Sequence, residues 1–442
     1  MLFACLLVAI ALRGAVVWLH ADELSHDRDA YLGIARGVAE GKGYVDVNRP
    51  TPTAFRPPLY PIQLAGLMTV LPPTASVAVV NVFWGLVSVW ATWRAGQCLG
   101  LGVGSIFAAL LVAVDPMLLL YSAQPMTEVT CAGLVALLVY WMVRRDCSEP
   151  WRQFGVGLLF GGLVLCRPTF WPLAGLVVMA WLVTEFVRIR RAPRTPSPVS
   201  SVAMRLTIPW RVVLGTLLIV GPWVMRNQLV IGSPILMTTH GGYTLLLANN
   251  PVFYDEVVDR GWGSEWSKSS FDRWTQELLA SLASELGPDS TEVERDRWQG
   301  LQARRFIAAQ PGRFLRAAWY RTRSLWSIVP QGEAAAANGS RLVQWVGVYY
   351  TVILLMFVVG MPVVAVRVYR RGELFRPCPW WPLFALILTV QAVHLVYWTN
   401  ARMRAPVVPV MSLFAAAALR RPADNAVTSF QSDKSAGSAG LS

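Results

Sequence analysis

The stretch VQWVGVYYTVILLMFVVGMPVVAV (343–366) runs for 24 residues without one charged side chain. A helix needs about 20 mostly apolar residues to cross the hydrocarbon core of a bilayer. The stretch is therefore predicted to be a transmembrane helix. Since similar runs recur along the chain, the whole protein is predicted to be embedded in a membrane.

The other apolar runs define the expected architecture, which is an all-α polytopic membrane protein with about 10 transmembrane helices. One more run, 59–71, is short and ends at Pro72-Pro73, which favours an interfacial or re-entrant helix over a full crossing. The predicted spans besides 343–366 are 1–19, 75–93, 101–115, 127–143, 154–167, 169–187, 209–225, 380–399 and 405–420.

The composition agrees with this class. The chain is 55% hydrophobic and only 15% charged, whereas soluble proteins carry about 25% charged residues. It also holds 20 Trp residues, many at the ends of apolar runs, as an interfacial aromatic belt requires. The net charge of +13 comes from arginine clusters that flank spans, so we expect membrane lipids as partners and no nucleic acid.

Basic residues lie between alternate spans, and this pattern predicts the orientation. With ten spans, every cluster falls on one side, which should be the cytoplasm and should hold both termini. An alternative is that the first run is a cleaved signal peptide, but it lacks a charged start and Arg13 interrupts it. The clusters are Arg94; Arg144, Arg145 and Arg152; Arg188, Arg190, Arg191, Arg194 and Arg205; Arg367, Arg370, Arg371 and Arg376; and Arg420 and Arg421.

These patterns divide the chain into four parts. Residues 1–225 form an N-terminal transmembrane region with a first outer loop at 20–74. Residues 226–342 form a large non-cytoplasmic loop domain of mainly helical or mixed structure, in which the basic and aromatic segment 311–329 suits a helix lying on the membrane surface. Residues 343–420 form the C-terminal transmembrane helices. Residues 421–442 form a disordered cytoplasmic tail, and 192–208 a cytoplasmic linker.

The first outer loop carries the most chemistry. The segment HADELSHDRDAYLGIARGVAEGKGY (20–44) places four carboxylates, including Asp27 and Asp29, within eight positions at the mouth of a membrane helix. They could be a solvated acidic loop with a helix N-cap, a general base, or ligands of a divalent metal ion at Asp27 and Asp29. No cofactor is certain. In PTPTAFRPPLYP (50–61), five prolines stiffen the backbone that holds Arg56 at the depth of lipid phosphates.

The order of these residues resembles the first outer loop of bacterial glycosyltransferases of the GT-C superfamily. The resemblance is narrower to the branch similar to dolichyl-phosphate-mannose–protein mannosyltransferases and to the aminoarabinose transferase of lipid A. The matching residues are Asp27, Tyr31-Leu32, Ala35-Arg36, Glu40-Gly41, Gly43-Tyr44, Pro52-Thr53, Arg56-Pro57-Pro58 and Tyr60-Pro61.

Further motifs follow in the order that the family shows, so the resemblance covers residues 1 to about 420. They are Thr127-Glu128, Arg167-Pro168-Thr169, Pro222-Trp223 with Arg226-Asn227, Gly232, Gly241-Gly242, Asn249-Asn250-Pro251, Gln310-Pro311 with Phe314-Leu315, and Arg402 and Arg404 with Pro406 and Pro409.

The resemblance implies an enzyme of the bacterial cytoplasmic membrane that transfers a sugar from a polyprenyl-phosphate donor to a protein, lipid or glycan acceptor at the outer face. It implies Asp27 as the general base. The sequence departs from the family at Arg28, where an acidic residue is common, and Asp29 supplies a second carboxylate. Substrate and phosphate binding is assigned to Arg56, Tyr60, Glu128, Arg167, Arg226, Arg402 and Arg404.

The physical requirements of such a reaction agree with these residue types. Guanidinium groups stabilise the charge that develops on the departing phosphate, and a carboxylate accepts the acceptor's proton. Two alternatives remain open. The chain could be a transporter or flippase of lipid-linked saccharides, which would place polar residues at the membrane midplane, or a scaffold whose outer domain binds a partner.

Overall fold

The computed structural model describes residues 1–144, 149–191, 210–264, 266–329, 340–371 and 378–419. Within those residues the regular structure is helical, and the only β-pairing is an isolated bridge between Val45 and Pro52. The loop domain is therefore helical rather than mixed over the residues described. The predicted linker 192–208 and the predicted tail 421–442 lie outside the described residues.

Each predicted apolar run contains a helix. Several of these helices have a proline in their first turn, where the missing N–H group costs no hydrogen bond. The helices of the apolar runs are α1 (Leu2–Leu19), α3 (Leu59–Met68), α4 (Pro73–Cys98), α5 (Gly104–Ala113), α7 (Glu128–Val143), α8 (Pro150–Cys166), α9 (Trp171–Arg191), α10 (Trp210–Ile231), α17 (Ser340–Arg370), α18 (Trp381–His394) and α19 (Val408–Ala418). The short helix α6 (Pro116–Leu120) follows the run 101–115.

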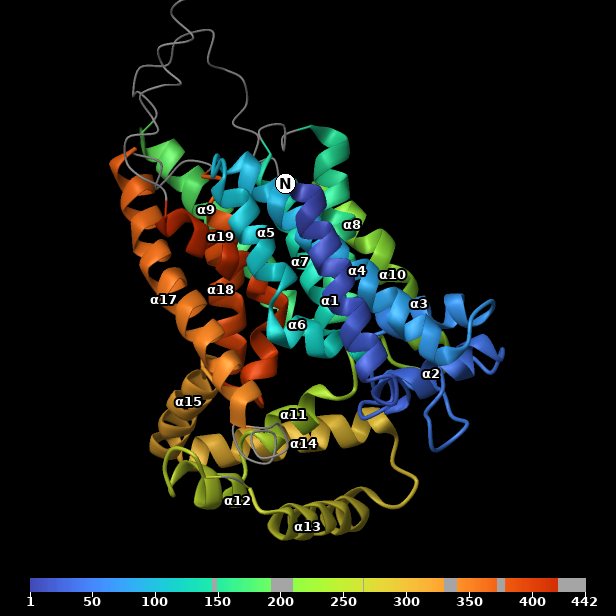
Figure 1. Ribbon diagram of the computed structural model, residues 1–442. Coiled ribbons are helices and arrows are strands. Elements are labelled where there is room, and N and C mark those ends of the chain that lie inside the picture. The colour runs from blue at the N-terminus through green and yellow to red at the C-terminus, as the bar shows by residue number, and fades with distance from the viewer. Residues whose placement is uncertain (145–148, 192–209, 265, 330–339, 372–377, 420–442) are drawn as a thin grey trace, which may run out of the picture.

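These helices form one bundle (Figure 1), and glycines allow the closest contacts between them. A Cβ atom at Gly157 of α8 would lie 2.2 Å from the carbonyl oxygen of Val212 on α10. A Cβ atom at Gly360 of α17 would lie 1.9 Å from the carbonyl oxygen of Phe414 on α19. Small residues at such crossings let helix backbones approach, which is how membrane helices gain packing energy.

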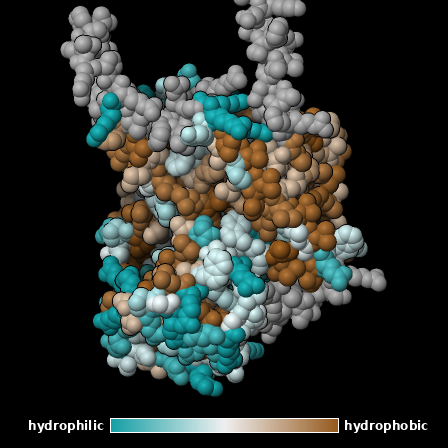
Figure 2. Space-filling view, turned by 90° about the vertical axis from the view of Figure 1, so that its left-hand side faces the viewer, coloured by the Kyte–Doolittle hydropathy of each residue, from teal (hydrophilic) through white to brown (hydrophobic). Residues whose placement is uncertain are grey.

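The outside of the bundle is apolar. Leu7, Leu217 and Leu355, from three different helices, are each about half exposed or more. Figure 2 shows a broad hydrophobic belt between hydrophilic ends on one side of the molecule. Since a water-soluble protein rarely exposes so large an apolar surface, this belt is expected to contact lipid.

Four described helices are long and apolar enough to cross a membrane, namely α1, α4, α10 and residues Val343–Arg370 of α17. A fifth crossing is possible if α5 and the segment Pro116–Ala123, which bend by 45° at Asp115, count as one span. Other apolar helices, such as α3, α7 and α18, are shorter. About ten crossings therefore stays a prediction.

The two ends of the bundle differ. The N-terminus lies at the end opposite α13 and α14 (Figure 1). We call the end that carries α13 and α14 the domain side. Since α17 begins on the domain side and runs through the bundle, its final Arg367 and Arg370 lie at the same end as the N-terminus. The assignment of this end to the cytoplasm stays a prediction.

The loop domain follows α10, which continues to Ile231, six residues beyond the predicted boundary at 225. Its amphipathic helices bury Leu245, Trp274 and Leu278 together. Side-chain caps begin two of them, at Ser267 and at the Thr291–Glu294 capping box. The elements are α11 (Gly241–Leu247), α12 (Pro251–Phe253), η4 (Tyr254–Val258), α13 (Lys268–Leu286), α14 (Glu292–Ala309) and α15 (Pro311–Leu325).

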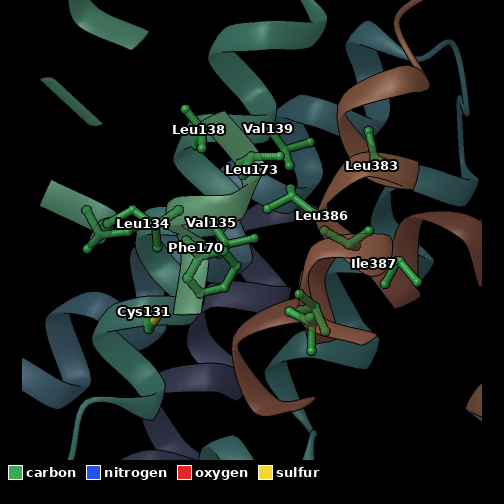
Figure 3. Packing of buried hydrophobic residues seen from close by; sticks show 14 of the residues in the cluster. Cys131, Leu134, Val135, Leu138, Val139, Phe170, Leu173, Leu383, Leu386 and Ile387 are labelled. Carbon is green, nitrogen blue, oxygen red and sulfur yellow. The ribbon is translucent and has the colours of Figure 1, made fainter. Parts of the chain in front are cut away.

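A dense apolar core runs through the helix bundle. Figure 3 shows residues of α7, including Leu134 and Leu138, together with Phe170 beside α9 and Leu386 of α18. Because α7 is buried along most of its length, its first residue is held rigidly at the domain side. That residue is Glu128.

Candidate functional site

Five charged side chains from distant parts of the sequence meet on the domain side. Asp29 lies in the loop after α1, and Arg56 lies before α3. Glu128 begins α7, Arg167 follows α8, and Arg402 lies in η5 (Ala401–Val407). We call these five residues the charged cluster. All five were predicted as site residues from the sequence.

The cluster is a continuous chain of ion pairs. Arg56 Nη2 lies 3.0 Å from Asp29 Oδ1, and Arg402 Nη1 lies 3.6 Å from Asp29 Oδ2. Arg402 Nε lies 3.3 Å from Glu128 Oε1, the same oxygen that Arg167 Nη2 contacts at 2.6 Å. Arg402 therefore joins the acidic loop after α1 to the start of α7.

The lower part of the cluster is buried and preorganised. The Glu128 side chain is only 1% exposed, and a carboxylate at a helix N-terminus is favoured by the helix dipole. Arg167 also donates through Nε to Thr127 Oγ1 at 3.1 Å. A buried charge is costly without partners, so these contacts hold Arg167 and Glu128 in fixed positions. The two residues support the more exposed members of the cluster.

The upper part of the cluster is open to ligands. The side chains of Asp29 and Arg402 are 25% and 24% exposed. Three guanidinium groups face two carboxylates, which leaves one positive charge in excess. Glu128 Oε2 is buried and has no hydrogen-bond partner among the residues described. The excess positive charge and the partial exposure of Arg56 and Arg402 suit the binding of an anion beside them.

Arg56 is positioned by its own loop. Its Nε donates to the backbone oxygen of Asp29 at 2.7 Å, and its guanidinium carbon lies 5.4 Å from the ring centre of Tyr31. Tyr31 packs edge-on against Tyr60 at 5.7 Å between ring centres. Tyr60 is fully buried and donates to Asn81 Oδ1 at 3.1 Å. Tyr60, a predicted substrate-binding residue, therefore supports the site from behind.

Two charged side chains, Arg226 and Glu292, hydrogen-bond to the loop before Arg56. Arg226 donates to the backbone oxygens of Tyr44 and Thr53 at 2.7 and 2.8 Å. Glu292, at the start of α14, accepts from Thr53 Oγ1 and from the Ala54 N–H, each at 2.7 Å. Arg226 is thus not in the charged cluster, and Glu292 ties the loop domain to the segment that carries Arg56.

Asp27 and Asp29 point into different environments. The Asp27 carboxylate accepts hydrogen bonds from the N–H groups of Leu32 and Gly33 at 3.0 and 2.6 Å, so it caps α2 (Tyr31–Ala39). Between Asp29 and α2, Ala30 adopts a φ of 63°. This left-handed conformation costs an alanine about 1 kcal/mol or more. Asp29 reaches the arginines, while Asp27 does not.

Arg404 lies apart from the cluster although it is only two residues from Arg402. It is 1% exposed, and it donates to the backbone oxygens of Leu325 and Ser327 at 2.8 and 2.6 Å. Its guanidinium also lies 4.3 Å from the ring centre of Tyr350. These contacts join the end of α15 to η5, and they leave Arg404 with a bonding pattern suited to a structural role.

Several residues of the site were not singled out from the sequence. Tyr121 lies near Arg402, and His240 packs against Phe55 with ring centres 4.4 Å apart. Burial, and then the nearby Arg56, lower the pKa of His240 to about 3, so its ring is neutral at physiological pH. A histidine before the pair Gly241-Gly242 gives no local signal for this contact.

No cluster of three or more potential metal ligands of the His, Cys, Asp and Glu types occurs in the part of the chain that the structure describes. The carboxylates of Asp27 and Asp29 are directed to α2 and to the arginines, respectively. Metal binding by this pair stays a prediction.

No family model matches the chain, and no curated protein matches it significantly. The similar solved structures include two of one protein. The crystal structure of ArnT from Cupriavidus metallidurans bound to undecaprenyl phosphate is 16% identical, with a TM-score of 0.43 over 96% of this chain and 79% of that chain. The apo structure of the same protein is 14% identical, with a TM-score of 0.40 over 93% and 77%.

At these identities and TM-scores, the function of this chain has to be inferred from its own residues and geometry.

Proposed function

We propose that this chain is a membrane glycosyltransferase that moves a sugar from a polyprenyl-phosphate donor to an acceptor on the domain side of the bundle. One observation supports this proposal above all others. Residues 29, 56, 128, 167 and 402 bring three guanidinium groups and two carboxylates together at one end of an apolar helix bundle. A lipid-linked phosphate would be fixed at that depth by its own polyprenyl chain.

Arg56 and Arg402 are the proposed phosphate ligands. Both are partly exposed, and both now contact the single carboxylate of Asp29. A phosphate between them would replace that carboxylate as their partner. Because the negative charge on the phosphate increases as the bond to the sugar breaks, the two guanidinium groups would stabilise the transition state more than the bound donor.

Asp29 is the proposed general base. In the reaction, an acceptor hydroxyl or amine attacks the anomeric carbon, the bond from that carbon to the phosphate oxygen breaks, and the polyprenyl phosphate leaves. The acceptor's proton passes to the carboxylate that the arginines have released. The family resemblance instead implies Asp27. We favour Asp29 because its carboxylate lies among the arginines, whereas Asp27 is bonded to two N–H groups of α2.

The proposal is tested by incubating the purified protein with a panel of undecaprenyl-phosphate sugars and following sugar loss by mass spectrometry. Consumption of one donor supports transfer. Asp29→Asn should then lower the rate at least a hundredfold, the contribution of a general base. Asp27→Asn should affect the rate mainly by weakening the hydrogen bonds that cap α2. If only Asp27→Asn abolishes turnover, Asp27 is the base as the resemblance implies.

A transporter or flippase is the competing proposal. The buried Asp115 at the bend between α5 and α6 is the feature that would suit it. However, Asp115 is satisfied by the Leu118 N–H at 2.9 Å and by the Tyr350 hydroxyl at 3.1 Å, as expected of a structural contact. Movement of a labelled lipid-linked sugar across reconstituted vesicles without transfer would establish the competing function.

A further inference from the structure

Helix α15 has two different faces. Its buried face includes Ala317, Arg321 and Leu325. The opposite face exposes Leu315 and Trp319, which are 68% and 71% exposed. Since successive residues of an α-helix are rotated by about 100°, these two exposed side chains fall on one stripe. Two large apolar residues on one exposed stripe indicate contact with an apolar medium or a partner.

The buried face anchors α15 to the end of the bundle. Arg321 donates to the backbone oxygen of Leu395 at 2.6 and 2.9 Å and to that of Ala248 at 2.8 Å. The indole of Trp326, directly after the helix, donates to Gln391 Oε1 at 2.7 Å and stacks on Phe357 of α17. The helix is thereby fixed beside the domain-side end of α17 (Figure 1), at the lower edge of the apolar belt in Figure 2.

The exposed face of α15 forms one wall of a groove of about 470 Å³. The other wall is the turn after η4, where Trp262 stands 5.4 Å from Tyr320 between ring centres. Arg323 covers the ring of Trp262 with its guanidinium carbon 4.0 Å from the ring centre. The groove is lined by Val258, Gly261, Trp262, Leu315, Arg316, Trp319, Tyr320 and Arg323.

The charge at this groove is positive. Arg313 contacts Asp255 and Asp259, and Arg316 lies 3.2 Å from Asp259. Two arginines of α15 thus pair with two carboxylates, whereas Arg323 has no carboxylate within ion-pair distance among the described residues. The groove therefore complements a single anionic group, with aromatic and aliphatic side chains beside it.

We infer that this groove binds the phosphate of an anionic phospholipid from the leaflet on the domain side. Arg316 and Arg323 hold the phosphate, while Leu315, Trp319 and Trp262 lie at the boundary between headgroups and acyl chains, which suits tryptophan. The position at the edge of the apolar belt selects a membrane lipid as the occupant, because its acyl chains can enter the bilayer directly. This site is separate from the charged cluster and does not depend on the proposed transferase activity.

The test uses the full-length protein in nanodiscs that contain a trace of photoactivatable phosphatidylglycerol or photoactivatable phosphatidylcholine. Cross-linked peptides are identified by mass spectrometry. We expect the phosphatidylglycerol probe to label peptides from 258–264 and 311–325 more strongly than the phosphatidylcholine probe. Added inorganic phosphate should not compete, since it lacks acyl chains. Equal labelling by both probes, or displacement by inorganic phosphate, would overturn the inference.

Matched variants localise the effect. Arg316→Gln with Arg323→Gln should weaken labelling of these peptides by phosphatidylglycerol about 30-fold, the effect of two basic side chains at an anionic surface. Arg273→Gln with Arg305→Gln removes the same charge from exposed positions of α13 and α14 and should leave labelling unchanged. The inference fails if both double variants behave alike. The comparison of the two probes on the unaltered protein decides the matter even if a variant does not fold.

Discussion

Replacing Glu292 by alanine should release the loop that carries Arg56. The Glu292 carboxylate accepts two hydrogen bonds, from Thr53 Oγ1 and from the N–H of Ala54, a fully buried residue. Hydrogen bonds to a charged group contribute about 1.5–3 kcal/mol each. Their loss should lower the free energy of local opening by about 3 kcal/mol, because Arg226 still holds the same loop from the other side.

Hydrogen–deuterium exchange measures this opening directly. A change of about 3 kcal/mol corresponds to roughly a hundredfold loss of amide protection, and it should be confined to peptides that cover 45–56. Glu277→Ala is the control, because Glu277 is an exposed carboxylate on α13 of the same domain. Unchanged protection of 45–56 in Glu292→Ala would refute the claim that the loop domain positions Arg56, as would an equal loss of protection in the control.

Three other predictions concern stability. Glu128→Gln should lower the free energy of unfolding by about 3–5 kcal/mol, because it leaves buried guanidinium groups uncompensated; the double variant Glu128→Gln with Arg167→Gln should recover part of it in thermal unfolding. Ala30→Gly should raise the unfolding free energy by about 1 kcal/mol, since glycine tolerates a φ of 63°; a lower value would contradict the strained turn. The pKa of His240 is about 3 in the folded protein and 6.5 in the unfolded chain. The neutral ring therefore contributes its full share to the free energy of unfolding above pH 6.5, and this share is lost as the pH falls toward 3. Stability should drop by about 1–2 kcal/mol between pH 7 and pH 5, and His240→Phe should remove this dependence in melts across that range.

The helices and the general location of the site follow from local sequence. Long apolar runs predict helices because a membrane requires every backbone group to be bonded within the segment. The alternation of arginine clusters then places the segments around residues 29, 56, 128, 167 and 402 at one end, before any distance is known. The count of crossings is less certain, because helices such as α7 and α18 are short.

The roles of neighbouring residues could not be predicted in this way. Arg402 and Arg404 lie in a 3₁₀-helix, where successive residues turn by about 120°. Residues two apart therefore point in different directions, and the sequence does not say which one reaches the site. Asp27 and Asp29 are also only two residues apart and take different partners, and the sequence does not say which carboxylate reaches the arginines.

Contacts between segments that are far apart in the chain could not be predicted from the sequence either. Glu292 contacts Ala54 across 238 residues, and nothing near Glu292 distinguishes it from the other carboxylates of an amphipathic helix. Only the packed arrangement of α14 against the first loop gives this residue a role.

The central claim is that Arg56 and Arg402 bind the phosphate of a polyprenyl phosphate, and equilibrium binding tests it most directly. Titration of the purified protein with undecaprenyl phosphate should show saturable binding, and Arg402→Gln should weaken it about tenfold or more, as expected for loss of a charge-assisted hydrogen bond. Arg273→Gln should bind as the unaltered protein does. Equal affinity of the Arg402→Gln variant would contradict the assignment of the charged cluster as a phosphate site.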